Sequence, residues 1–235
     1  MPASPEFVEK LFSQLAPVYE KVSVAISGGM ILHWYDLLFK TLDRIYRIKS
    51  RDGKRIEHLD IATGTGLIPL WIWKHWRNKV SVTGIDLTEG MLKIARHRMP
   101  DWKFIVGDAL NLPFDDNSFD VATVTFGLRN MEDPAKAISE AYRVLRSGGY
   151  FLVLEVVPYP NPLLQRLFEM HVGTVSAIAG GILSGNITPY VYFAGSVDSF
   201  FTREGFEKAC RNAGFRKVGI LPMAFGGSIL AICQK

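Results

Sequence analysis

The sequence is poor in cysteine, because only Cys210 and Cys233 occur among its 235 residues. No CxxC pair is present, which excludes a disulfide framework and a zinc site built from cysteines. Runs of one charge are also missing, since Lys+Arg 27 against Asp+Glu 23 leaves a net charge of +4 that is spread along the chain. We therefore expect a reducing, cytoplasmic location and no nucleic-acid partner.

The chain also lacks the features of export and membrane insertion. Its first residues, MPASPEF, contain no basic segment followed by an apolar run, so no secretory signal is expected. The stretch 172–193 is poor in charge but is interrupted by glycines and a proline, which predicts a buried or interfacial helix followed by a loop rather than a membrane span. Hydrophobic residues at 48% and charged residues at 21% are typical of a soluble globular protein.

Strand and helix patterns alternate from residue 56 onward. Strands are expected at 56–61, 80–85, 103–106, 119–125 and 150–156, with helices at 67–76, 89–98 and 134–145. Because parallel neighbours need crossover connections, this alternation predicts an α/β fold with a doubly wound, mostly parallel, Rossmann-like sheet. After a helix at 203–213, strands at 217–221 and 228–233 are joined by a short connection, which predicts a C-terminal antiparallel hairpin and seven strands in all.

The length fits one domain over residues 1–235, with two appended parts. Residues 1–50 are expected to form two helices and an N-terminal helical lid, whereas the aromatic-rich segment 158–201 breaks the alternation and reads as a substrate-side insertion. The first helix carries an apolar stripe with Lys10 and Lys21 nearby, which is typical of a lid packed on the core or of a peripheral membrane contact. A homodimer is a further open alternative.

A glycine-rich loop follows the first expected strand. It contains Asp60 and then Gly64-Thr65-Gly66, at the position where an open parallel sheet binds its ligands. Asp86 ends the second strand about 20 residues after Gly66, where an acidic side chain typically accepts hydrogen bonds from ribose hydroxyls. The pattern therefore indicates a nucleoside cofactor.

The loop also indicates which nucleoside it binds. Pro69 stands where a dinucleotide fingerprint needs Gly or Ala, which disfavours a dehydrogenase, and the Lys-Ser/Thr pair of a phosphate loop is absent. The negative charge of Asp60 repels phosphates but suits a ligand that carries an ammonium and a sulfonium. These features favour S-adenosylmethionine. The five histidines have no metal-ligand spacing, so no metal site is expected.

A second acidic position ends the third strand. The carboxylate of Asp108 and the backbone amide of Ala109 suit the amino group and ring nitrogen of adenine. An equally good interpretation is that Asp108 caps a short helix.

Several motifs resemble those of a known enzyme family. They are FGLRN at 126–130, RVLRSGG at 143–149 and LVLE at 152–155. With these motifs the chain resembles class I S-adenosylmethionine-dependent methyltransferases, and more closely the ubiquinone/menaquinone biosynthesis C-methyltransferase family, over almost its whole length. The resemblance implies cofactor contacts, and we group with them Leu87, which follows Asp86. The implied contacts are Thr65, Asp86, Asp108, Ala109 and Thr125.

The same resemblance implies catalytic residues. A ring carbon becomes nucleophilic when its phenol loses a proton, so a cation beside the phenol oxygen is required. Arg129, oriented by Asn130, is the candidate for that cation, and Tyr19 is a candidate to close the pocket and hydrogen-bond the substrate. The alternatives are a capping or surface role for Arg129 and a buried, satisfied hydroxyl for Tyr19.

We therefore expect a methyltransferase that C-methylates a hydrophobic quinol or phenolic acceptor, using S-adenosylmethionine. Ile31 and Leu32 replace a polar pair that is usual in the family, so O- or N-methylation of another small apolar molecule stays open. A methyltransferase-like binding protein without turnover is the non-enzyme alternative.

Overall fold

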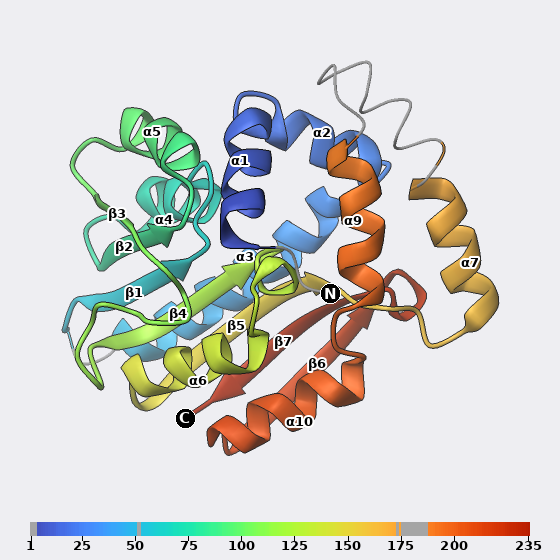
Figure 1. The fold of residues 1–235 in the computed structure, drawn as a ribbon. Helices are drawn as coiled ribbons and strands as arrows, with labels where there is room; N and C mark the ends of the chain where they lie inside the picture. The colour runs from blue at the N-terminus through green and yellow to red at the C-terminus, as the bar shows by residue number, and fades with distance from the viewer. Residues whose placement is uncertain (1–3, 51–52, 173, 175–187) are drawn as a thin grey trace.

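The computed structural model describes residues 4–50, 53–172, 174 and 188–235. Its strands form one sheet in the order β3-β2-β1-β4-β5-β7-β6 (Figure 1). The strands are β1 (Ile56–Ile61), β2 (Val80–Asp86), β3 (Lys103–Val106), β4 (Phe119–Thr125), β5 (Leu145–Val156), β6 (Lys217–Met223) and β7 (Ser228–Gln234). Strands β1 to β5 pair in parallel, whereas β7 is antiparallel to both β5 and β6. The predicted fold class, including the C-terminal hairpin, is confirmed.

Helices cover both faces of this sheet (Figure 1). They are α1 (Pro5–Leu15), α2 (Tyr19–Ile26), α3 (Met30–Lys49), α4 (Leu67–Trp76), α5 (Glu89–Arg98), α6 (Pro134–Val144), α7 (Pro162–His171), α9 (Thr188–Asp198) and α10 (Arg203–Ala213). Buried residues of α6 and α10, such as Ile138 and Phe206, pack on one face. Buried residues of α3 and α4, such as Leu42 and Ile72, pack on the other. Because both faces are covered, the central strands β1 and β4 are buried along most of their length.

Three helices, rather than the expected two, precede the sheet. Ser4 caps α1, because its Oγ accepts a hydrogen bond from the backbone N–H of Phe7 at 3.3 Å. Gly28 and Gly29 then separate α2 from α3 with φ of +57° and +83°, a conformation that glycine adopts without steric cost. The glycine pair is the sequence signal for the additional helix boundary.

The apolar stripe of α1 faces the protein. Val8, Leu11 and Leu15 are buried, and Phe7 is 39% exposed. Most of the apolar area of this face is therefore already covered by the rest of the protein. No single helix among the described residues is long and apolar enough to cross a membrane. Helices α2 and α3 would be so only when taken together, and they meet at a bend of 107°.

Two further segments differ from expectation. Strand β5 begins at Leu145 rather than at residue 150, because Leu145 pairs with Phe119 ahead of an irregularity in the register. Most of the segment 172–193 lies outside the described residues, but its end is helical, since α9 begins at Thr188 where a loop was expected.

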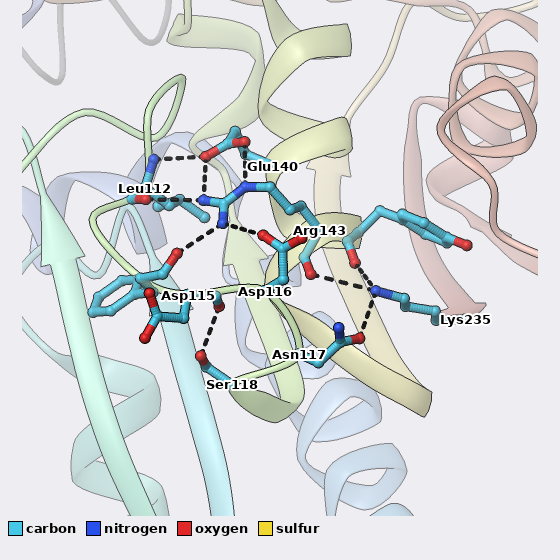
Figure 2. A network of polar contacts seen from close by, with 10 residues as sticks. Leu112, Asp115, Asp116, Asn117, Ser118, Glu140, Arg143 and Lys235 are labelled. Carbon is cyan, nitrogen blue, oxygen red and sulfur yellow. Dashed lines mark hydrogen bonds and ion pairs between the residues drawn. The ribbon is translucent and has the colours of Figure 1, made fainter.

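Arg143 of α6 anchors the loop that leads into β4 (Figure 2). Its guanidinium donates to both carboxylate oxygens of Glu140 at 2.8 Å and to the carbonyl oxygens of Leu112 and Phe114 at 2.9 and 2.7 Å. It also contacts Asp116 at 2.8 Å. The RVLRSGG motif thus has a structural role at this residue.

Replacing Arg143 by lysine should lower the free energy of unfolding by about 2 kcal/mol, because an ammonium group cannot form the planar bidentate contact and both carbonyl contacts together. For a chain of this size we expect the melting temperature to fall by about 4–8 °C in calorimetry. Arg211→Lys, at an exposed pair with Glu207, is the matched control. Equal melting temperatures for the two variants would contradict this role.

Candidate functional site

Two adjoining cavities lie at the carboxyl ends of the parallel strands. The first cavity, of about 260 Å³, is lined by the glycine loop, by residues at or just after the ends of β2, β3 and β4, and by parts of α1, α2 and α3. The second cavity, of about 450 Å³, is lined by α1, α2, α3, α7, α9 and the turn between β6 and β7. Residues that line both cavities are Phe12, Tyr19, Ser23, Ile31, Phe126 and Asn130. The site therefore has two compartments that meet at one junction.

Asp86 organises the floor of the first cavity. One of its carboxylate oxygens accepts a hydrogen bond from the Gly64 N–H, and the other accepts one from the Thr88 N–H, both at 2.8 Å. Burial raises the pKa of Asp86, while these backbone hydrogen bonds oppose the rise. Gly64 has a φ of +56°, and its missing Cβ would meet no heavy atom within 4 Å. The loop thus presents bare backbone to the cavity.

Five other predicted cofactor residues line the first cavity. They are Thr65, Leu87, Asp108, Ala109 and Thr125. Asp108 also accepts a hydrogen bond from the Leu110 N–H at 2.9 Å, so its carboxylate caps the local turn as well. Ile31 and Leu32, which depart from the family pattern, also line this cavity.

Asp60 and Gly66 do not line either cavity. Asp60 is 1% exposed beneath the loop, where it accepts hydrogen bonds from Thr63 at 2.6 Å and Thr123 at 2.5 Å. The expectation that it lies at the mouth of the loop is wrong. Gly66, with a φ of +80°, packs on α5, because its missing Cβ would lie 2.8 Å from Met99 Cε. Its role is close helix packing rather than approach to a ligand.

Glu20 of α2 is a lining residue that the sequence analysis did not identify. Its Oε1 accepts hydrogen bonds from Thr65 Oγ1 at 2.6 Å and from Arg98 Nη1 at 2.5 Å. Burial opposes its ionisation, but these two partners outweigh burial and lower its pKa. Glu20 therefore joins the N-terminal helices to the glycine loop. A sequence signal is lacking, because its partners lie 45 and 78 residues away.

The first cavity suits a nucleoside that carries an amino acid. Asp86 and Asp108 have carboxylates that suit ribose and base, and Gly64 leaves space for close approach of a ligand. Among the described residues, no group of three or more His, Cys, Asp or Glu side chains could hold a metal ion.

Arg129 lines the second cavity and is paired with a buried carboxylate. Its Nη1 lies 2.6 Å from Glu155 Oε1 and donates to the Phe126 carbonyl at 2.8 Å. The two side chains are 6% and 0% exposed. Because Arg129 is buried and paired with Glu155, it is not the surface charge considered as an alternative from the sequence. Glu155 belongs to the LVLE motif, but no sequence pattern indicates that Arg129 is its partner.

The residues around Arg129 are strained and incompletely hydrogen-bonded. Phe126 has a φ of +55°, and its carbonyl accepts from both Arg129 and Asn130. The guanidinium carbon of Arg129 lies 4.8 Å from the centroid of the Phe193 ring. Arg129 Nε and Asn130 Oδ1 are buried without any hydrogen-bond partner. One unpaired donor and one unpaired acceptor thus belong to adjacent residues, and such groups are costly unless a ligand satisfies them.

Tyr19 lies at the junction of the two cavities. Burial raises the pKa of its hydroxyl, Arg129 opposes the rise and Glu155 adds to it. The phenol is therefore neutral at physiological pH and available to donate a hydrogen bond. The structure brings Tyr19, Arg129 and Asn130 together, as the sequence predicted.

Comparison with known proteins shows the family of this chain. The model of the ubiE/COQ5 methyltransferase family matches residues 2–235. A demethylmenaquinone methyltransferase from Chlorobaculum tepidum is 35% identical, covering 97% of this chain and 92% of its own. A ubiquinone/menaquinone biosynthesis C-methyltransferase from Campylobacter jejuni is 32% identical, covering 98% of both chains.

Solved structures agree on the fold. A methyltransferase dependent on S-adenosylmethionine from Thermotoga maritima matches with a TM-score of 0.61 and 23% identity, covering 97% of this chain and 99% of that one. The match to the family model extends over the glycine loop, Asp86, the FGLRN segment and Glu155. The chain therefore belongs to the ubiE/COQ5 family of methyltransferases, and S-adenosylmethionine is its cofactor.

Proposed function

We propose that this methyltransferase transfers a methyl group to a ring carbon of a hydrophobic quinol or related phenol. The observation that carries the proposal is that Arg129 and Asn130 both line the second cavity, and that Arg129 Nε and Asn130 Oδ1 are buried with no hydrogen-bond partner. A ring hydroxyl can accept from the first and donate to the second, so it satisfies both buried atoms at once. The names of the relatives from Chlorobaculum tepidum and Campylobacter jejuni support the same acceptor class.

The second cavity supports an apolar acceptor. Its walls are mostly aliphatic and aromatic, for example Leu11, Trp34 and Phe168, and its polar groups are few. Ligand sites of this composition bind through apolar contact and fix orientation with a small number of polar anchors. We infer that the quinol ring lies at the junction and that an apolar tail extends into the second cavity.

We propose that the cofactor binds in the first cavity. Asp86 would accept from its ribose, Asp108 and Ala109 would contact its base, and Gly64, Thr65, Leu87 and Thr125 would complete the wall. When bound, S-adenosylmethionine supplies an electrophilic methyl group on a positively charged sulfur. Since a neutral thioether leaves, the protein needs chiefly to position the acceptor and to activate its ring.

Activation of the ring would fall to Arg129 and its neighbours. As the acceptor hydroxyl passes its proton to solvent, negative charge grows on its oxygen, and the donor Arg129 Nε would stabilise that charge. Glu155 and the Phe126 carbonyl hold the guanidinium in place, so little reorganisation is needed. Asn130 would orient the hydroxyl, and Tyr19 would close the junction and donate to the acceptor's oxygen.

The test is turnover with S-adenosylmethionine that carries a carbon-13 methyl group. Reduced demethylmenaquinone analogues with short and long tails are the acceptors, and the product is examined by NMR for a carbon-bound methyl. We expect carbon-linked product and a lower KM for the longer tail. An oxygen-linked methyl, or turnover only of an unrelated phenol or amine, would overturn the quinol assignment and leave the methyltransferase assignment intact.

We also propose a peripheral contact with a lipid surface at the mouth of the second cavity. Met30, Leu167 and Phe225 line this cavity, yet they are 50%, 51% and 88% exposed. Leu163 and Met170 extend the exposed apolar stripe along α7. An apolar rim that continues into an apolar cavity suits an acceptor that enters from a bilayer.

Flotation with vesicles of anionic and neutral phospholipid tests this contact. We expect the protein to float with the vesicles and the double variant Leu167→Ser/Phe225→Ser to stay behind, with Ile48→Ser as the matched control at an exposed site on α3. Absence of flotation at low salt, or equal flotation of both variants, would refute the contact. A homodimer stays a prediction, which analytical ultracentrifugation would check.

A further inference from the structure

A buried chain of hydrogen bonds runs from α3, across the sheet, to the glycine loop. The Tyr46 hydroxyl lies 2.6 Å from His58 Nδ1, and His58 Nε2 lies 2.9 Å from Thr123 Oγ1. Thr123 Oγ1 lies 2.5 Å from Asp60 Oδ1, and Asp60 Oδ2 lies 2.6 Å from Thr63 Oγ1. All five residues are at most 6% exposed. The methyl-transfer mechanism uses none of them directly.

The chemistry of these groups determines which of them donates and which accepts in each hydrogen bond. If Asp60 is ionised, it can only accept, so Thr123 and Thr63 both donate to it. The oxygen of Thr123 then accepts from the His58 Nε2–H, which leaves Nδ1 to accept from the Tyr46 hydroxyl. Burial lowers the pKa of His58 to about 3, so its ring is neutral and has one N–H to give. Every donor in the chain therefore points toward Asp60.

We propose that this series of hydrogen bonds holds Asp60 in place behind the cofactor site, where its carboxylate makes the site favour the charged cofactor over its neutral product. Thr63 lines the first cavity, so the carboxylate lies one hydroxyl group behind the cavity wall. S-adenosylmethionine carries a positive sulfonium, whereas S-adenosylhomocysteine has a neutral thioether and the same ammonium and carboxylate. The proposal rests on the cofactor binding in the first cavity.

Asp60 is suited to respond to that charge. Burial raises its pKa to about 7, the hydrogen bonds from Thr123 and Thr63 oppose the rise, and Asp86 adds to it. The titratable groups that face Asp60 are His58 on β1, Asp86 on β2 and the two phenols Tyr35 and Tyr46 on α3. A nearby positive charge favours the ionised carboxylate, so binding of the cofactor should expel a proton from Asp60 into the solvent.

The sign of the pH effect follows from this linkage. Below about pH 7 the free protein carries a proton on Asp60 that the cofactor must displace, so affinity for the cofactor falls as pH falls. If the sulfonium lowers the pKa of Asp60 by about one unit, the preference for S-adenosylmethionine over S-adenosylhomocysteine should shrink about fivefold from pH 8 to pH 6. Because both ligands share the amino-acid group, the ratio of their affinities isolates the sulfonium.

Calorimetry of both ligands tests the proposal without measuring turnover. In buffers of different ionisation enthalpy at pH 7, we expect the wild-type protein to release part of a proton with S-adenosylmethionine and less with S-adenosylhomocysteine. Asp60→Asn should weaken S-adenosylmethionine binding about tenfold and change S-adenosylhomocysteine binding less than about twofold. The retained binding of the product shows that the variant is folded.

Thr123→Val removes the hydroxyl that links His58 to Asp60 at nearly constant volume, and it tests the role of these hydrogen bonds. We expect the affinity ratio to fall about threefold, with Thr83→Val on β2, which lies on the other side of β1 from β4, as the matched control. Equal weakening of both ligands in Asp60→Asn would mean that Asp60 only shapes the loop. Equal proton release with both ligands in the wild-type protein would overturn the proposal even if neither variant folded.

Discussion

Replacing Asp86 by asparagine should weaken the binding of S-adenosylmethionine about 100-fold, a loss of about 2.7 kcal/mol. Two causes act together. The carboxylate is expected to accept from ribose hydroxyls, and a hydrogen bond to a charged group contributes about 1.5–3 kcal/mol. The carboxylate also accepts from the N–H groups of Gly64 and Thr88. An asparagine amide would set an NH₂ against one of these donors and disturb the loop.

Titration calorimetry measures the Asp86 effect directly. Asp101→Asn, at an exposed position before β3, is the control for the loss of one negative charge and should bind like the wild-type protein. A folded Asp86→Asn protein with unchanged affinity would remove this residue from the cofactor site.

The second large effect is expected for Arg129→Lys, which should lower kcat about 100-fold and change cofactor affinity little. Lysine keeps the charge that Glu155 needs, so it avoids the penalty of about 3–5 kcal/mol for leaving one partner of a buried pair alone. It loses the Nε donor that we propose binds the acceptor's oxygen, and removal of one such donor in other enzymes costs about 10²–10³ in kcat.

Arg146→Lys is the matched control for the Arg129 variant, because Arg146 also forms one ion pair, with Asp120 at 2.8 Å, but lines neither cavity. Single-turnover kinetics should place the Arg129→Lys defect in the chemical step. Wild-type turnover in a folded Arg129→Lys protein would mean that guanidinium geometry has no specific role.

The sheet could be predicted from sequence because its signals are local. Each parallel strand contains several apolar residues, and each is followed by a turn or helix signal within a few residues. The start of β5 was missed for a different reason. Leu145 joins the sheet through pairing with Phe119, a contact between distant residues that no periodicity reveals.

The candidate site likewise has residues that local sequence patterns predict and residues whose position depends on distant contacts. Gly64 and Asp86 were predicted because a strand, a glycine turn and a second strand fix their spacing. The depth of Asp60 was missed, because it depends on hydroxyl partners such as Thr123 on another strand. The pairing of Arg129 with Glu155 was missed for the same reason. The two residues are 26 positions apart, one just after β4 and the other on β5.

The most direct test of the account is a crystal structure of the protein with S-adenosylhomocysteine and a quinol analogue bound together. The account predicts the ribose hydroxyls at Asp86, and one ring hydroxyl within hydrogen-bond distance of Arg129 Nε and Asn130 Oδ1, with the tail in the second cavity. A ring that binds outside the junction, with Arg129 Nε and Asn130 Oδ1 still unpaired, would contradict it.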